Sequence, residues 1–212
     1  MNTTKSIVRP RRAPVTPCRP LDEALWYACG QRWAVVPLWL PQPSWEDHAT
    51  TEPAVIRGWW TWDPVAPVVL PTGRDFDVLD VPEEAGRAAL GRLQRRGVRI
   101  GPVAVTDGGR FWFFVQAGAR EELPAQLEWL DWAGIALDIH VHGTGDYVLA
   151  PRCTGPRTGD GAIWVRPPQG VHSPHAGPSQ DLPEVLPMLD ALAHAVFATV
   201  LAPARDHAGA TA

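Results

Sequence analysis

The strongest constraint on the fold is the order of elements within residues 75–116. The stretch 75–81, DFDVLDV, is a short apolar run typical of a strand, and Pro82 suits the first turn of a helix. This helix is expected to end at Gly97, with an inner stripe of Ala85, Ala89, Leu90 and Leu93. A strand at 101–106, a turn at 107–109 and a strand at 110–116 then predict a β-hairpin. Residues 75–116 should therefore mix strand and helix in the order β-α-β-β.

Further elements flank this unit on both sides. Before it we expect two helices, over 21–31 and opening within 48–60, and two strands, 33–40 and 65–70, the second joined to 75–81 by a turn at Gly73. After it we expect a helix over 122–134 and strands over 135–143, 146–152 and 162–168. A last, largely apolar helix, 182–202, either packs on the domain or contacts a partner.

Proline and charge divide the chain into segments. Residues 1–20 carry basic side chains and no acidic one, and we expect a disordered arm there. A domain over 21–168 is followed by a proline-rich linker over 169–181, the helix over 182–202 and a tail over 203–212. The arm could touch phosphates, but a solvated disordered tail is the favoured explanation.

The overall composition excludes several classes of protein. A net charge of −4 does not predict strong nonspecific nucleic-acid binding. The three cysteines, Cys18, Cys29 and Cys153, are not spaced as a metal knuckle or a disulfide framework, which favours a reducing cytoplasm. No apolar run has the length of a membrane span, and no export signal is visible. Most of the 11 tryptophans should pack in the core, and a minority could stack on bases.

Four stretches in order resemble one known family. They are HATTEPAVIRGWW, PTGRDFDVLDVPEEAGRAAL, VTDGGRFWFFV and ALDIHVHGTGDYVLAPR. Together with 162–168 they resemble the bifunctional DNA primase/polymerase domain of the archaeo-eukaryotic primase superfamily. The resemblance implies an α/β (α+β) fold with an RRM-like antiparallel or mixed sheet and a cleft. It also implies nucleic acid or a nucleoside triphosphate as partner, with Mg or Mn as cofactor if the chain is active and none otherwise.

The catalytic positions of that family are only partly kept. Its first metal-binding aspartate corresponds to Asp80 and its third-strand aspartate to Asp138, but its second aspartate corresponds to Pro82 and its phosphate-contacting histidine to Phe111. Divalent ions held by paired carboxylates drive nucleotidyl transfer, so two losses should impair it. Asp77 cannot replace the missing ligand on a regular strand, because it lies on the face opposite to that of Asp80.

Two other sets of residues are candidates for binding. Asp138, His140 and His142 alternate on one strand face and, with Asp80 across the cleft, could hold Zn, Mn or Fe. The alternative is a polar strand face whose histidines are hydrogen-bonded and metal-free. Arginine suits phosphate, and three arginines lie at turns or strand ends near the expected cleft: Arg74, Arg110 and Arg152.

The sequence therefore predicts a primase/polymerase-like domain with a degenerate metal site. We expect it to bind nucleic acid or nucleotide rather than to polymerise efficiently, and a role near DNA replication follows from the resemblance alone. The first alternative is an active template-dependent nucleotidyltransferase using Asp80 and Asp138. The second is a non-catalytic scaffold that dimerises through 182–202.

Overall fold

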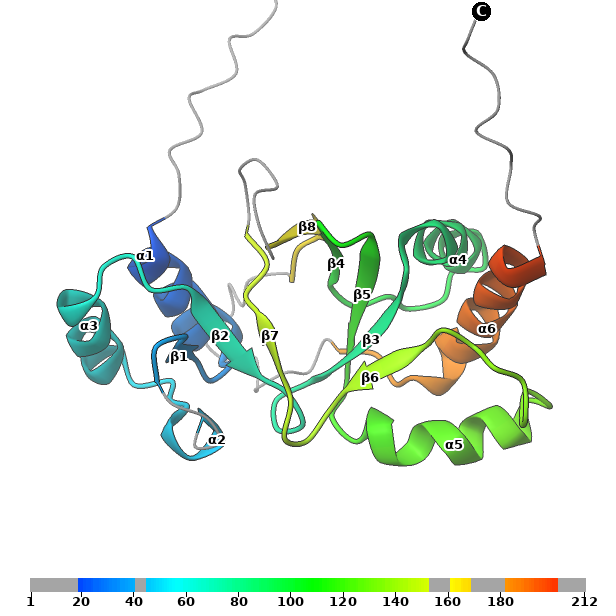
Figure 1. The fold of residues 1–212 in the computed structure, drawn as a ribbon, viewed down its shortest axis with the longest axis horizontal. Coiled ribbons are helices and arrows are strands. Elements are labelled where there is room, and N and C mark those ends of the chain that lie inside the picture. The colour runs from blue at the N-terminus through cyan, green and yellow to red at the C-terminus, as the bar shows by residue number, and fades with distance from the viewer. Residues whose placement is uncertain (1–18, 41–44, 153–160, 169–181, 202–212) are drawn as a thin grey trace, which may run out of the picture.

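A five-stranded antiparallel sheet forms the centre of the molecule, in the order β6-β3-β5-β4-β8 (Figure 1). The structure is a computed structural model that describes residues 19–40, 45–152, 161–168 and 182–201. The predicted linker (169–181), the tail (203–212) and nearly all of the basic arm (1–18) lie outside these residues. The sheet strands are β3 (Asp77–Pro82), β4 (Val103–Thr106), β5 (Arg110–Val115), β6 (His140–His142) and β8 (Ala162–Arg166).

The larger sheet has the expected β-α-β-β order and continues with a second helix and strand. β3 leads into α4 (Glu83–Arg95), β4 and β5 pair as a hairpin, and α5 (Ala119–Trp129) leads to β6. This β-α-β-β-α-β order is that of RRM-like sheets and confirms the predicted fold class. Pro82 is the N-cap of α4, and the buried Ala85, Ala89 and Leu93 form its inner stripe as predicted.

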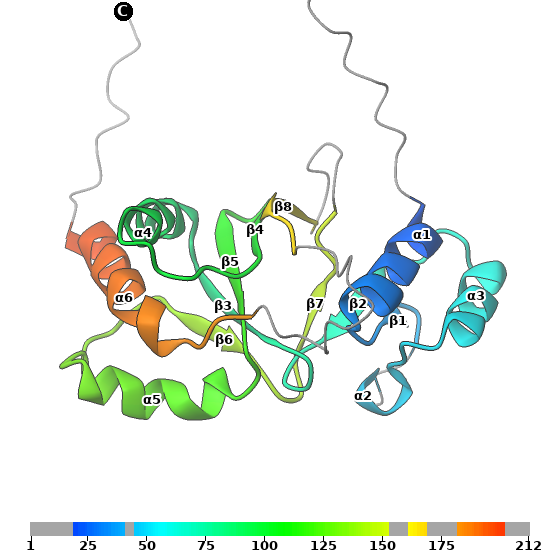
Figure 2. The same ribbon diagram turned by 180° about the vertical axis from the view of Figure 1, so that it is seen from behind.

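A smaller antiparallel sheet, β1-β2-β7, lies beside the larger one (Figures 1 and 2). Its strands are β1 (Val36–Pro37), β2 (Val68–Pro71) and β7 (Tyr147–Leu149). The helices of this part are α1 (Pro20–Leu25), which continues as a π-helical segment over Trp26–Gln31, α2 (Trp45–His48) and α3 (Pro53–Trp62). The predicted strand at 33–40 shrinks to two residues, because only Val36 and Pro37 pair with β2.

Two connections cross between the sheets and touch each other. One runs from β2 to β3 and the other from β6 to β7, so each pair of consecutive strands is split between the sheets. The Thr72 hydroxyl donates to the carbonyl of Gly143 at 2.7 Å. Gly73, at φ +90°, passes so close to Thr144 that a Cβ there would lie 2.3 Å from its Cα. The Gly73 turn is therefore a joint between sheets rather than a hairpin.

The two faces of the larger sheet have different coverings. Leu79 and Val81 of β3 point into a core that α4, α5 and α6 (Leu186–Leu201) share. Val78 points to the other face, where the aromatic side chains of Trp33 and Phe114 stack at 5.5 Å between the two sheets. Asp80 lies on this second face, beyond the apolar contact with the smaller sheet.

The C-terminal helix packs on the domain, which is one of the two outcomes expected for 182–202. α6 lies against α4 and buries Met188, Leu189, Leu192 and Val196 in the helix-covered core. Its apolar face is therefore used within the chain, which weakens the idea of a dimerisation helix. No helix among the residues described has the length and apolar character needed to cross a membrane.

Candidate functional site

Asp80, Asp138 and Arg110 meet on the face of the larger sheet opposite the one that α4, α5 and α6 cover. Asp80 of β3 pairs with Trp112 and Pro82 pairs with Arg110 in the β3–β5 register. The Arg110 side chain therefore starts two residues from the position opposite Asp80, on the same face. Asp138 reaches this point from the segment that leads into β6, and β6 pairs with β3 on its other side. Three neighbouring strands thus position the cluster.

The Arg110 guanidinium lies between the two carboxylates and donates to both. Its Nε lies 2.6 Å from Oδ1 of Asp80, and its Nη2 lies 3.1 Å from the Asp80 carbonyl oxygen. Its Nη1 donates to both side-chain oxygens of Asp138, at 3.0 and 2.8 Å. Charge-assisted bonds of this kind are among the stronger hydrogen bonds in proteins. Arg110, which we expected to contact phosphate, here bridges the two predicted catalytic aspartates.

The two predicted metal-binding histidines also contact these carboxylates: His142 reaches the second oxygen of Asp80, and His140 shares one oxygen of Asp138 with Arg110. His142 Nε2 lies 3.1 Å from Oδ2 of Asp80, and His140 Nε2 lies 3.1 Å from Oδ1 of Asp138. Both histidines are on β6 and share a face, as their spacing predicts. We name the set Asp80, Arg110, Asp138, His140 and His142 the carboxylate cluster.

The electrostatics of the carboxylate cluster favour its charged form. Burial by itself raises the pKa of Asp80, but hydrogen bonds from His142 and Arg110 outweigh burial, and the pKa is lowered overall. The hydrogen bond from Arg110 also lowers the pKa of the more exposed Asp138. Burial would lower the pKa of Arg110, yet its bonds to Asp138 and Asp80 raise it. All three side chains therefore stay ionised across the physiological range.

The residues present do not fit a two-metal centre in this arrangement. Every side-chain oxygen of Asp80 and Asp138 has a nitrogen within 3.1 Å. Pro82, at the place of the second family aspartate, offers no side-chain ligand. Within the described part of the chain, no three His, Cys, Asp or Glu side chains are grouped so as to hold a metal ion. The Arg110 guanidinium supplies the positive charge instead.

Phe111, the residue aligned with the family histidine, lies on the other face of the sheet. Its side chain is fully buried in the helix-covered core, and a Cβ on Gly86 of α4 would lie 2.4 Å from its Cβ. A side chain at position 111 therefore cannot reach Asp80 through the sheet. The residues of β5 that share the face of Asp80 are Arg110, Trp112 and Phe114, and the Trp112 ring lies edge-on to His142.

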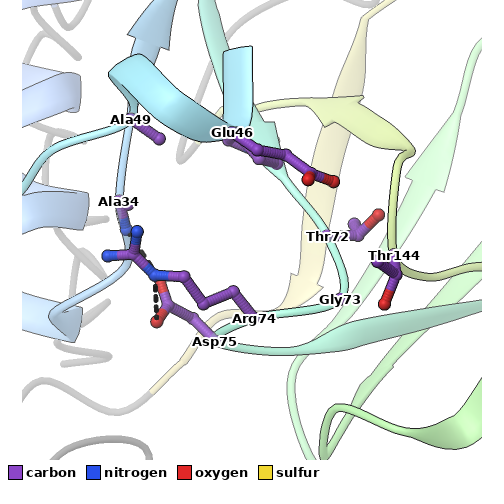
Figure 3. Close-up of a pocket in the computed structure, with 9 residues that line it drawn as sticks. Ala34, Glu46, Ala49, Thr72, Gly73, Arg74, Asp75 and Thr144 are labelled. Carbon is purple, nitrogen blue, oxygen red and sulfur yellow. Dashed lines mark hydrogen bonds and ion pairs between the residues drawn. The ribbon is translucent and has the colours of Figure 1, made fainter. Parts of the chain in front are cut away.

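Arg74 lies at a separate small pocket near the joint between the sheets (Figure 3). The pocket has a volume of about 90 Å³ and also contains Thr72, Thr144 and the carboxylates of Asp75 and Glu46. Arg74 lies 3.6 Å from Asp75, whose other oxygen accepts a bond from the Ala34 amide at 2.8 Å. One guanidinium thus shares the pocket with two carboxylates, and the carboxylate cluster contributes nothing to its lining.

Arg152, the third predicted phosphate-binding residue, lies near a buried acid that the sequence did not single out. Glu23 of α1 is only 8% exposed, and its Oε1 has no hydrogen-bond partner among the residues that the structure describes. Burial raises the pKa of Glu23 to about 7, against the opposing attraction of Arg152. From the sequence, Glu23 is expected only to interact favourably with the helix dipole in the first turn of α1. Nothing in the local sequence shows that this side of α1 is buried.

Most of the chain matches a known protein family. A family model described as bifunctional DNA primase/polymerase, N-terminal, matches residues 24–185. The match spans both sheets, ends next to α6, and confirms the resemblance carried by the four stretches. A search of curated proteins found no match for the chain.

Proposed function

The chain belongs to the bifunctional DNA primase/polymerase family, and on this premise we propose that it binds nucleic acid or nucleotide through a domain whose polymerase centre is closed. The single observation that carries this function is the Arg110 guanidinium bonded to Asp80 and Asp138. A divalent ion would have to displace the Arg110 Nη1 from both oxygens of Asp138 and break the 2.6 Å contact of Arg110 with Asp80.

The loss of one metal-ligand position also disfavours polymerisation. Pro82 leaves Asp80 as the sole carboxylate on this face of β3, since Asp77 points to the other face. Two-metal phosphoryl transfer needs ions that contact both the attacking and the leaving oxygen. One carboxylate from β3, already paired with Arg110, is a poor basis for it. We therefore expect binding without efficient polymerisation.

The phosphate contacts we assign to this chain come from arginines outside the cluster. Arg74 is largely exposed at its pocket, and its ion pair with Asp75 is long, at 3.6 Å. Arg152 is exposed, and its backbone pairs with Ile163 of β8. Each can turn its guanidinium toward a phosphate without breaking a short ion pair, whereas Arg110 cannot.

Binding can be tested by fluorescence anisotropy with labelled single-stranded DNA, duplex DNA and a nucleoside triphosphate, with and without EDTA. We expect at least one of these ligands to bind with the same affinity in EDTA. Arg74→Gln and Arg152→Gln should each weaken that binding roughly fivefold, which corresponds to about 1 kcal/mol. Arg57→Gln, on the outer face of α3, is the matched control. Failure of all three ligands to bind would contradict the function.

Polymerisation needs a separate measurement of template-dependent incorporation with Mg or Mn. We expect the wild-type chain to give no more product than its Asp80→Asn variant. Incorporation by the wild-type chain that Asp80→Asn abolishes would instead establish the active nucleotidyltransferase, the alternative that uses Asp80 and Asp138.

A further inference from the structure

Large apolar side chains are exposed together at one end of the smaller sheet. Trp62 ends α3 and is 74% exposed, Val65 follows it at 80%, and Leu38 and Trp39 after β1 are 39% and 38% exposed. The rings of Trp39 and Trp62 touch, with centroids 4.7 Å apart and planes tilted by 59°. The Leu38 amide donates to the carbonyl oxygen of Pro67, two residues after Val65, and this bond links the segment after β1 to the segment after α3. We name these four residues the tryptophan patch.

An exposed aromatic group of this kind is expected to be covered by a binding partner. Scattered apolar residues on a surface need no explanation, but contiguous ones mark sites of interaction. Trp39 and Trp62 contact each other and both remain partly exposed, so together they offer an aromatic surface to a partner. Such surfaces are what polyproline II segments dock on, because a proline ring packs flat against an indole.

The chain itself supplies a proline segment of matching period. Residues 14–20, PVTPCRP, place Pro14, Pro17 and Pro20 at intervals of three. A polyproline II helix has three residues per turn, so these three rings would line one face. Pro20 is the first residue of α1, and Arg19 before it has φ −71° and ψ 144°, which are polyproline II angles. Arg19, the described residue that precedes α1, therefore has the backbone conformation that such a segment requires.

The position of α1 brings this segment toward the patch. α1 packs against α3. The start of α1 and the connection that follows α3 lie at the same end of the molecule in both views (Figures 1 and 2). Ten residues of polyproline II span about 30 Å, more than the roughly 20 Å across two packed helices. The reach is sufficient without any rearrangement of the described residues.

The distribution of charge favours the basic N-terminal segment, rather than nucleic acid, as the partner of the tryptophan patch. Residues 1–18 carry four basic side chains and no acidic one. Over residues 20–66 the buried Glu23 is accompanied by five acidic side chains that reach the surface, Asp22, Glu46, Asp47, Glu52 and Asp63, against two exposed arginines, Arg32 and Arg57. A basic proline-rich segment is attracted to this surface, whereas a phosphate backbone is repelled.

We propose that residues 10–19 dock in polyproline II conformation on the tryptophan patch of their own chain. The docked segment covers Trp39 and Trp62 and holds the basic side chains of Arg11 and Arg12 near the acidic side chains of the helices and loops beside the smaller sheet. Attachment through α1 makes the contact intramolecular, so a weak interaction suffices to populate it.

The test uses the full chain labelled with 5-fluorotryptophan. Trp39→Phe and Trp62→Phe assign the two fluorine resonances. We expect Pro14→Ala with Pro17→Ala to shift both resonances, and the matched control, Val15→Ala with Thr16→Ala, to leave them in place because those side chains lie off the proline face. Trypsin should also cleave after Arg11 and Arg12 severalfold faster in the proline variant and in Trp62→Ala, a substitution at an exposed site.

Three outcomes would overturn the docking. Unchanged resonances and unchanged cleavage in the proline variant would show that the segment does not cover the patch. Resonances whose positions depend on protein concentration would assign the patch to a second copy. Resonances that respond to single-stranded DNA but not to the proline substitutions would assign it to nucleic acid.

Discussion

Asp77 and Asp80 lie three residues apart on β3, and their carboxylates act on opposite faces of the sheet. Asp77 Oδ2 accepts hydrogen bonds from the amides of Gly118 and Arg120, at 3.2 and 3.3 Å, where α5 begins. Asp80 contacts Arg110 and His142 on the other face. The carboxylate-rich strand therefore carries a helix cap and an ion-pair partner rather than a pair of adjacent metal ligands.

The first prediction separates the two properties of Asp77, its acceptor oxygen and its charge. Burial raises the pKa of Asp77, against the hydrogen bonds from the α5 amides. A folded-state pKa above the unfolded value means that the stability from this group is lost as pH rises through the folded pKa. Asp77→Asn keeps an acceptor without the charge and should be at least as stable as wild type near pH 7, whereas Asp77→Ala should lose about 1–2 kcal/mol.

Urea unfolding of both variants measures this difference. Equal destabilisation by Asp77→Asn and Asp77→Ala would show that the cap depends on the negative charge itself. The exposed Asp22 of α1 provides a control, since Asp22→Asn removes a carboxylate that accepts no such bonds.

The parts of the fold that depend on neighbours in sequence were predictable. The stop at Pro82, the stripe of α4, the end at Gly97 and the turn at 107–109 are local signals, and the structure has all of them. The start of α5 at Ala119 was predicted three residues late, because its cap comes from Asp77, more than forty residues away. The assignment of β2 and β3 to different sheets also depends on distant pairing partners.

In the candidate site, too, some features follow from the local sequence and others depend on contacts between distant residues. Strand periodicity separated Asp77 from Asp80 and placed His140 and His142 on one face. It could not predict that Arg110 bridges Asp80 and Asp138, because that contact depends on where the segment before β6 crosses the end of β5. Alignment by residue order also placed Phe111 in the site, although the pleat turns it into the core.

The second prediction concerns the buried Glu23. Its folded-state pKa of about 7 exceeds the ordinary 4.5, so the stability it contributes is fully present below about pH 4.5 and is lost as pH rises through 7. Glu23→Gln should therefore stabilise the chain at about pH 8 by at most about 3 kcal/mol and have little effect at about pH 4.5. Thermal or urea unfolding at the two pH values measures it, with Asp22→Asn as control. A pH-independent effect would contradict the raised pKa.

The third prediction uses two glycines of α4. A Cβ on Gly86 would lie 2.4 Å from Cβ of Phe111, while one on Gly91 would meet only the flexible end of Arg95 at 3.4 Å. Gly86→Ala should therefore cost about 2–3 kcal/mol of unfolding free energy. Gly91→Ala should add about 0.5–1 kcal/mol, because alanine is the better helix former. Tolerance of Gly86→Ala would mean that α4 does not press on Phe111 and that position 111 is less firmly part of the core.

The fourth prediction asks whether Arg110 and Pro82 together close the centre. Pro82 pairs with Arg110 in the sheet and is the N-cap of α4 without a side-chain cap bond. Aspartate is a favoured N-cap, so Pro82→Asp should fold and place a second carboxylate on the face of Asp80. Alone it should bind no Mn²⁺, because Arg110 remains as an internal cation among the carboxylates. Arg110→Gln alone frees Asp80 and Asp138 but leaves the second β3 ligand absent.

The double variant, Pro82→Asp with Arg110→Gln, should bind Mn²⁺ at least about tenfold more tightly than either single variant, a difference of about 1.4 kcal/mol or more in binding free energy. Manganese paramagnetic resonance or calorimetry measures it, and Pro82→Asp with Arg57→Gln is the control that removes an unrelated guanidinium. The physical reason is that a divalent ion needs both an added carboxylate and the removal of the charge that now neutralises Asp80 and Asp138. If Pro82→Asp alone bound Mn²⁺ as tightly as the double variant, Arg110 would yield readily to a metal ion, and the chain would lack one ligand rather than hold a closed centre.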